Sequence, residues 1–141
     1  MRDNFFLKQR LDHLWKEHFS DVPKSNRVDI RFGRCAEKRL GSIRQRIDHT
    51  DTLIMLNGHF RDKKIPNYII DATIVHELCH YAYGFSSPLP QLSKFPHRGG
   101  VVKKELLKRG LGELLEKETS WLNKNWTKYL KENSKHGART L

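Results

Sequence analysis

The fold is organised around one stretch of the chain, Ile70-Asp71-Ala72-Thr73-Ile74-Val75-His76-Glu77-Leu78-Cys79-His80-Tyr81. An α-helix turns by about 100° per residue, so His76 and His80 lie one above the other on the same face. Both imidazole rings can therefore reach one metal ion. Glu77 lies one residue further round, close enough to contact a water on that ion without being a ligand. This His-Glu-x-x-His spacing is typical of zinc hydrolases, in which two histidines bind the metal and the glutamate is the general base.

The residues around this motif predict a buried helix. It is expected over Tyr68–Tyr83 and is apolar on most of its circumference, at Ile69, Ile70, Ala72, Ile74, Val75, Leu78 and Ala82. Unpaired polar groups in a core cost a few kcal/mol each, and one metal ion would satisfy two histidines and a glutamate together. We therefore interpret the motif as a metal site rather than as histidines bonded to backbone carbonyls.

Length and composition indicate one soluble domain. The 141 residues suffice for one hydrophobic core, and we predict a single domain over residues 1–131 with a polar, flexible tail over residues 132–141. No apolar run is long enough for a membrane span or a signal peptide, so a cytoplasmic protein without membrane contact is expected. Cys35 and Cys79 are too few for a disulfide framework or a four-cysteine zinc ribbon, and both are predicted to be small buried side chains.

The charge of the chain bears on its partners. A net charge of +11 indicates an anionic partner, and DNA or RNA is the first candidate. The densest basic patch contains Arg31, Arg34, Lys38, Arg39, Arg44 and Arg46. A solvated surface without a partner fits the same composition equally well, so charge alone does not decide between them.

The remaining pattern predicts an α+β fold. A first helix, over residues 3–19, has an apolar stripe, and three strands follow at residues 28–32, 41–48 and 52–57. Their short connections indicate an antiparallel or mixed sheet that precedes the motif helix. Asn67 is expected to cap that helix and Gly84 to end it. C-terminal helices are expected from His97 to Gly110 and from Gly112 to Lys131, the last with leucines and aromatic residues on a packing face.

A catalytic zinc needs a third protein ligand and one open position. His97 follows His80 by seventeen residues and precedes two glycines that allow close backbone approach. Glu105, eight residues further on, lies among lysines and reads more simply as a solvated acid. His97 is therefore the favoured third ligand, with Glu105 the alternative.

Four features occur in order between residues 28 and 109: the segment Arg39-Leu40-Gly41, the strand Ile54-Met55-Leu56-Asn57, the motif helix, and the histidine followed by glycine at His97 to Gly99. Through them the chain resembles the SprT-like zinc metallopeptidases, small gluzincin-type HExxH proteases. The resemblance implies a Zn²⁺ cofactor and a protein or peptide substrate. It also implies that the substrate adds as an extended strand beside Ile54, Met55, Leu56 and Asn57.

The implied reaction is hydrolysis of a peptide bond with zinc held by His76, His80 and His97. Zinc would lower the pKa of its bound water to about 7, and Glu77 would take the proton and pass it to the leaving amine. The residue that stabilises the oxyanion is left open. Weak candidates, each with a simpler structural interpretation, are His59, Tyr81, Tyr83 and Arg98.

Two other functions compete with an endopeptidase. A basic nucleic-acid-binding module with a structural or relict zinc site would bind DNA or RNA with strong salt dependence and cleave no peptide. A protease whose cleft is covered by the long C-terminal helix would be inhibited as isolated. The physiological substrate, the cleavage preference and the oligomeric state are left open by the sequence.

Overall fold

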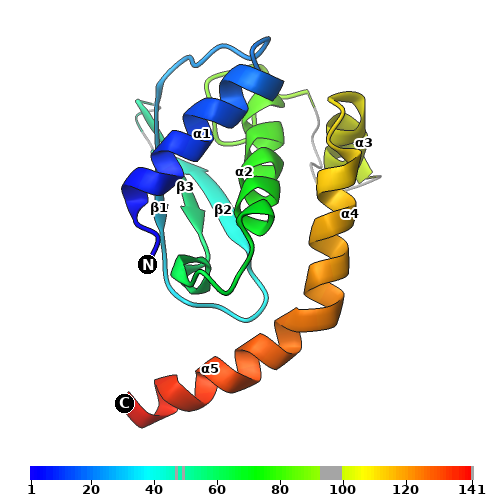
Figure 1. The fold of residues 1–141 in the computed structure, drawn as a ribbon. Helices are drawn as coiled ribbons and strands as arrows, with labels where there is room; N and C mark the ends of the chain where they lie inside the picture. Colours follow the sequence, from blue (N-terminus) through cyan, green and yellow to red (C-terminus); the bar gives the residue numbers. More distant parts are fainter. Residues whose placement is uncertain (47, 49, 93–99, 141) are drawn as a thin grey trace.

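The computed structural model describes residues 1–46, 48, 50–92 and 100–140, with side chains up to Asn133 (Figure 1). It has the predicted α+β architecture, with an N-terminal helix, a three-stranded sheet and then helices. The elements are α1 (Asn4–His18), β1 (Arg27–Phe32), β2 (Gly41–Gln45), β3 (Asp51–Leu56), the 3-10 helix η1 (Gly58–Arg61), α2 (Asn67–Ala82), α3 (Val101–Lys108), α4 (Gly112–Trp121), the π-helical η3 (Leu122–Trp126) and α5 (Thr127–Thr140). Within the described ranges, no helix is both long enough and apolar enough to cross a membrane.

The sheet is mixed, and its strand order is β1-β3-β2. β1 runs parallel to β3, whereas β2 runs antiparallel to it. Ile54 of β3 is paired with Ile30 on one side and with Ile43 on the other. The last strand in the sequence is therefore the central strand of the sheet.

The two faces of the sheet differ in what covers them. Val28, Ile30 and Phe32 alternate with exposed or half-buried residues, and they share a buried face with alternate residues of β3. Helices α1 and α2 pack side by side against this face (Figure 1). The opposite face carries mostly charged side chains, among them Arg31 and Arg44, which are exposed.

The start of α2 is held by a contact from the first residues of the chain. The predicted cap by Asn67 is wrong: the N-cap residue is Pro66, and no side chain caps this end. The Asn67 side chain instead accepts hydrogen bonds from the Arg2 guanidinium, at 2.7 and 3.1 Å. Arg2 also donates to the carbonyl oxygens of Phe60, Asp62 and Ile65. The end of α2 follows the prediction, because Gly84 adopts a φ of +80° just beyond it.

The C-terminal part is helical for longer than the sequence indicates. The expected helix end near Lys131 is wrong, because the backbone of α5 stays helical through Thr140, where a flexible tail is predicted from residue 132. Trp126 stacks on Tyr129 and donates its indole N–H to the Glu37 carbonyl at 2.8 Å. These aromatic residues thus hold the helix to the domain, as their packing interpretation predicts.

One of the two cysteines is buried, as predicted, and the other is exposed. Cys79 is buried in α2, and its burial raises the pKa of the thiol to about 12. Cys35 is exposed in the loop before β2, so the prediction of a buried side chain is wrong there.

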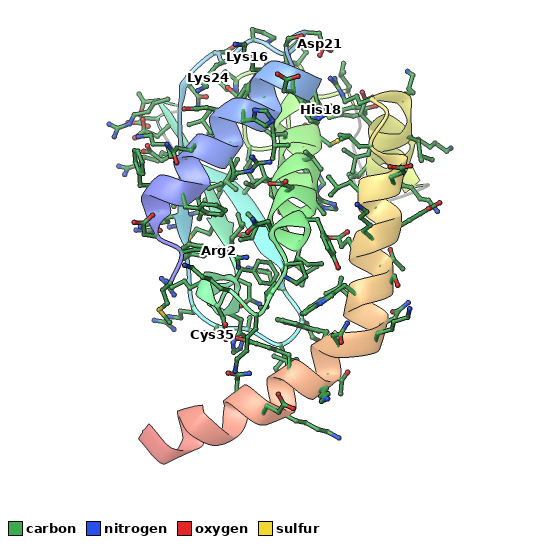
Figure 2. The ribbon with its side chains drawn as sticks, viewed as in Figure 1. Arg2, Lys16, His18, Asp21, Lys24 and Cys35 are labelled. Carbon is green, nitrogen blue, oxygen red and sulfur yellow. The ribbon has the colours of Figure 1, made fainter. Side chains whose placement is uncertain are left out.

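Arg109, just after α3, joins three parts of the fold. Its guanidinium donates to Glu105 at 2.8 Å, to the His18 carbonyl at 2.8 Å and to both carboxylate oxygens of Asp21. His18 and Asp21 lie at the C-terminal end of α1 (Figure 2). The same guanidinium lies over the Phe19 ring, 4.2 Å from its centroid. One largely buried cation therefore fixes α3 against the end of α1.

We predict that Arg109→Ala lowers the free energy of unfolding by about 2 kcal/mol, because it leaves the largely buried Glu105 carboxylate without its cation. Urea unfolding followed by circular dichroism measures this change. Lys108→Ala, at an exposed neighbouring position, is the matched control and should change stability by less than about 0.5 kcal/mol. Equal losses of stability in Arg109→Ala and Lys108→Ala would contradict the stabilising role of Arg109.

Candidate metal centre

The two motif histidines face each other on α2. Their Nε2 atoms are 3.2 Å apart, and their rings cross at 75°. The helix cannot rotate away from this position, because its fully buried side chains, Ile69, Ile70, Ile74 and Val75, fasten it in the core. His80 is 3% exposed and His76 is half-buried.

This geometry fits a zinc ion. Two imidazole nitrogens on a tetrahedral zinc, each about 2.0–2.1 Å from the metal, lie about 3.3 Å apart, close to the distance found here. Ligand atoms of His76, Glu77 and His80 all lie within 4.8 Å of one another. Among the described residues these three form the one group of histidine, cysteine or acidic side chains with such spacing. Imidazole nitrogen suits zinc and neighbouring transition metals rather than calcium or magnesium.

The Glu77 carboxylate is buried beside the two histidines. Its side chain is 4% exposed, and burial raises the pKa of its carboxyl to about 7, an effect that Arg39 partly opposes. A carboxyl with a pKa near neutrality exchanges protons efficiently with water at physiological pH. A Cβ atom at position 41 would lie 2.6 Å from Thr73 Cγ2 and 3.1 Å from a Glu77 carboxylate oxygen, so Gly41 leaves room for both side chains beside β2.

The two candidates for the third ligand have different outcomes. His97 lies outside the described residues, so its role stays a prediction. Glu105 is engaged elsewhere: one carboxylate oxygen accepts from the Tyr83 hydroxyl at 2.7 Å and the other from Arg109 at 2.8 Å. Its side chain is 13% exposed, so the interpretation as a solvated acid is wrong. With both oxygens bonded, Glu105 is not a ligand in this arrangement.

The predicted substrate-binding edge is wrong. Both edges of β3 are hydrogen-bonded, to β1 and to β2, so no peptide can add beside Ile54, Met55 or Leu56. Ile54 and Leu56 are core residues with 0% and 1% exposure. Asn57 is buried and clamps the loop before β2, donating to the carbonyls of Ala36 and Arg39 and accepting from the Ala36 N–H.

On this side of the sheet the edge strand is β2, and no described strand pairs with its outer edge. Backbone hydrogen bonds join Asn57 to Leu40 and Arg46 to Asp51, at the two ends of the antiparallel pairing. Bonded pairs alternate along an antiparallel ladder, so the N–H and C=O groups of Gly41, Ile43 and Gln45 point away from β3. The Ser86 hydroxyl donates to the Ile43 carbonyl at 3.3 Å. Gly41, beside Glu77, is therefore the end of this edge that lies at the metal centre.

A cavity of about 480 Å³ opens beside the candidate metal centre. It is lined by Lys38, Arg39, Leu40, Gly41, Thr73, His76, Glu77 and Glu118. Glu118, on α4, is absent from the residues singled out by sequence. The spacing of residues could have identified Glu118, because an apolar residue is expected at its position. It lies on the same helix face as Leu114, Leu115, Trp121 and Leu122.

The sequence candidates for the oxyanion donor are mostly engaged in the fold. The Tyr81 hydroxyl donates to Asn26 and accepts from the Ser25 N–H, far along the chain from the motif. The Tyr83 hydroxyl donates to Glu105, a bond that, with burial, raises the pKa of Tyr83 to about 12. His59 packs edge-on against Trp126 and Tyr129. Arg98 lies outside the described residues.

No protein-family model, curated protein or solved structure matches this chain. The function proposed below therefore rests on the chemistry and geometry of His76, Glu77 and His80 on α2.

Proposed function

We propose that the chain is a zinc-dependent peptidase of the SprT-like type. The observation that carries this proposal is the pair of imidazole nitrogens 3.2 Å apart on α2 with a buried carboxylate beside them. A buried helix holds these three polar groups at a spacing that one zinc ion would satisfy. A purely structural site would require four protein ligands, whereas the described residues bring together two histidines and one glutamate.

His76 and His80 would hold the metal, with His97 as the predicted third ligand. When bound, zinc lowers the pKa of a coordinated water to about 7 and polarises a substrate carbonyl. Glu77 takes the proton from the water that attacks the peptide carbonyl. It then delivers that proton to the amine that leaves, which restores the carboxylate.

The free edge of β2 supports a peptide as the substrate. An extended peptide can hydrogen-bond to the outward backbone groups of Gly41 and Gln45, as in other complexes formed by strand addition. Strand addition at Gly41 brings the peptide backbone next to Glu77, because position 41 lies against that carboxylate. In this proposal the edge positions the peptide, and Glu77 activates the water that attacks it.

We predict that Glu77→Gln binds zinc as the unaltered protein does but loses peptide cleavage by at least about 100-fold, because glutamine cannot accept the proton. His76→Ala should lose zinc as well as activity. Zinc content by atomic absorption and cleavage of a denatured protein followed by mass spectrometry measure the two effects. Cleavage that survives in Glu77→Gln would refute the mechanism.

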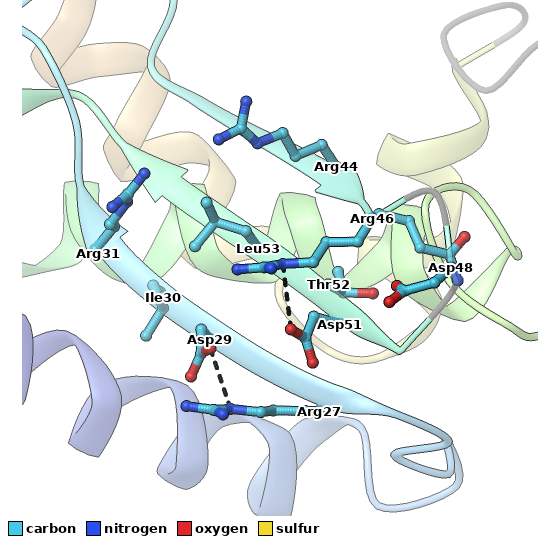
Figure 3. Close-up of a pocket in the computed structure, with 11 residues that line it drawn as sticks. Arg27, Asp29, Ile30, Arg31, Arg44, Arg46, Asp48, Asp51, Thr52 and Leu53 are labelled. Carbon is cyan, nitrogen blue, oxygen red and sulfur yellow. Dashed lines mark ion pairs between the residues drawn. The ribbon is translucent and has the colours of Figure 1, made fainter.

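Nucleic-acid binding is a second candidate function, favoured by one feature of the sheet face opposite α1 and α2. A shallow hollow of about 920 Å³ lies on this face, lined by Arg27, Arg31, Arg44, Arg46, Asp29, Asp48, Asp51 and neighbouring residues (Figure 3). Ion pairs join Arg27 to Asp29 and Arg46 to Asp51, both at 3.2 Å. In the described part of the chain, Arg31 and Arg44 have no acidic partner, and they flank Leu53. Two unneutralised guanidinium groups on an open surface suit phosphate contacts.

We predict that the double substitution Arg31→Ala and Arg44→Ala weakens binding of a labelled single-stranded oligonucleotide and lowers the slope of log K against log salt by about 1–2. Fluorescence anisotropy over a salt series measures both quantities. The matched control replaces Lys16 and Lys104, two exposed lysines on α1 and α3, by alanine and so removes the same charge. If both double variants weaken binding equally, the sheet face has no special role.

A further inference from the structure

Glu118 occupies an unusual place on α4. This helix packs against α2, and its contact stripe contains Leu114, Leu115 and Trp121, which are partly buried against the core. Position 118 is three to four residues from each of these neighbours, so it lies on the same stripe. A carboxylate at a packing position is costly unless it has a partner or a function.

The Glu118 side chain reaches the space in front of the general base. It lines the cavity of about 480 Å³ together with Thr73, His76 and Glu77 of α2 and with Gly41 at the start of the free edge. The cavity therefore runs from the carboxylate that would handle the proton to a second carboxylate on the facing helix. A water molecule takes about 30 Å³ of liquid, so this volume has room for a long amino-acid side chain.

Among the described residues, no cation is paired with the second carboxylate. Within the described chain, Glu118 makes no ion pair or hydrogen bond, and burial raises the pKa of its carboxyl to about 7. Lys38 and Arg39 also line the cavity, but both are exposed to solvent and neither is paired with Glu118. A cation that enters the cavity would supply the charge that this carboxylate lacks.

We propose that Glu118 forms the wall of a specificity subsite that accepts a lysine or arginine side chain of the substrate next to the peptide bond that is cut. This inference rests on the proposed peptidase function. The long apolar stem of lysine or arginine would lie along the cavity past Thr73, and its charged end would meet Glu118. Glu118 is thus a residue for choosing substrates rather than for the chemical step.

The test compares two peptidyl hydroxamates that differ only in lysine or norleucine at the side chain next to the zinc-binding group. Calorimetry on the zinc-loaded protein measures affinity without any need for turnover. The lysine compound should bind about 10-fold more tightly to the unaltered protein, and the difference should vanish in Glu118→Gln. Glu116→Gln, at an exposed position of the same helix, is the matched control and should keep the preference.

The results of this experiment distinguish failure of the Glu118 subsite from failure of the proposed peptidase function. Equal affinity of the unaltered protein for both compounds, or a preference that survives Glu118→Gln, overturns the subsite while leaving the peptidase intact. Failure of the zinc-loaded protein to bind either hydroxamate overturns the peptidase assignment and the subsite with it. Cleavage sites mapped on a denatured protein give a second measure, since enrichment of lysine and arginine beside the cut should be lost in Glu118→Gln only.

Discussion

The structure depends on one constraint, the burial of polar groups within α2. Most of this helix is sealed between the sheet, α1 and α4, yet it carries His76, Glu77 and His80 toward a single point. Desolvation makes that arrangement unfavourable for each group alone, as the raised pKa of Glu77 shows. A bound cation would compensate all three together, and the proposed zinc chemistry rests on this feature.

The strand order of the sheet places the start of β2 next to the polar side chains of α2. Because β3 is central, β2 has an outer edge with which no described strand pairs, and that edge begins at Gly41, beside Glu77. The clamp made by Asn57 holds the loop that leads into β2, and the missing Cβ atom at position 41 leaves room for the carboxylate. Fold and site are thus coupled through the placing of one short strand.

Much of the local structure follows from sequence pattern, and the errors have identifiable causes. The helix α1 and all three strands lie close to their predicted positions, because hydrophobic periodicity reports local structure. The cap by Asn67 fails because Arg2, sixty-five residues away, takes the Asn67 side chain. The interpretation of Glu105 as a solvated acid fails because the Tyr83 hydroxyl, twenty-two residues away, donates to it, and because its helical neighbour Arg109 is held in place by the distant Asp21. Both of these errors involve a contact between residues that are far apart in the sequence.

The sequence by itself determined the spacing of His76, Glu77 and His80, since helical geometry brings residues four apart onto one face. It also determined the apolar setting that makes those groups conspicuous. Only the tertiary structure decided that β2, not β3, has the open edge, and that Glu118 shares a cavity with Glu77. The physical reason is that strand order and helix packing arise from long-range hydrogen bonds and side-chain fit. A period of two or of 3.6 residues shows which face is buried, but not which element covers it.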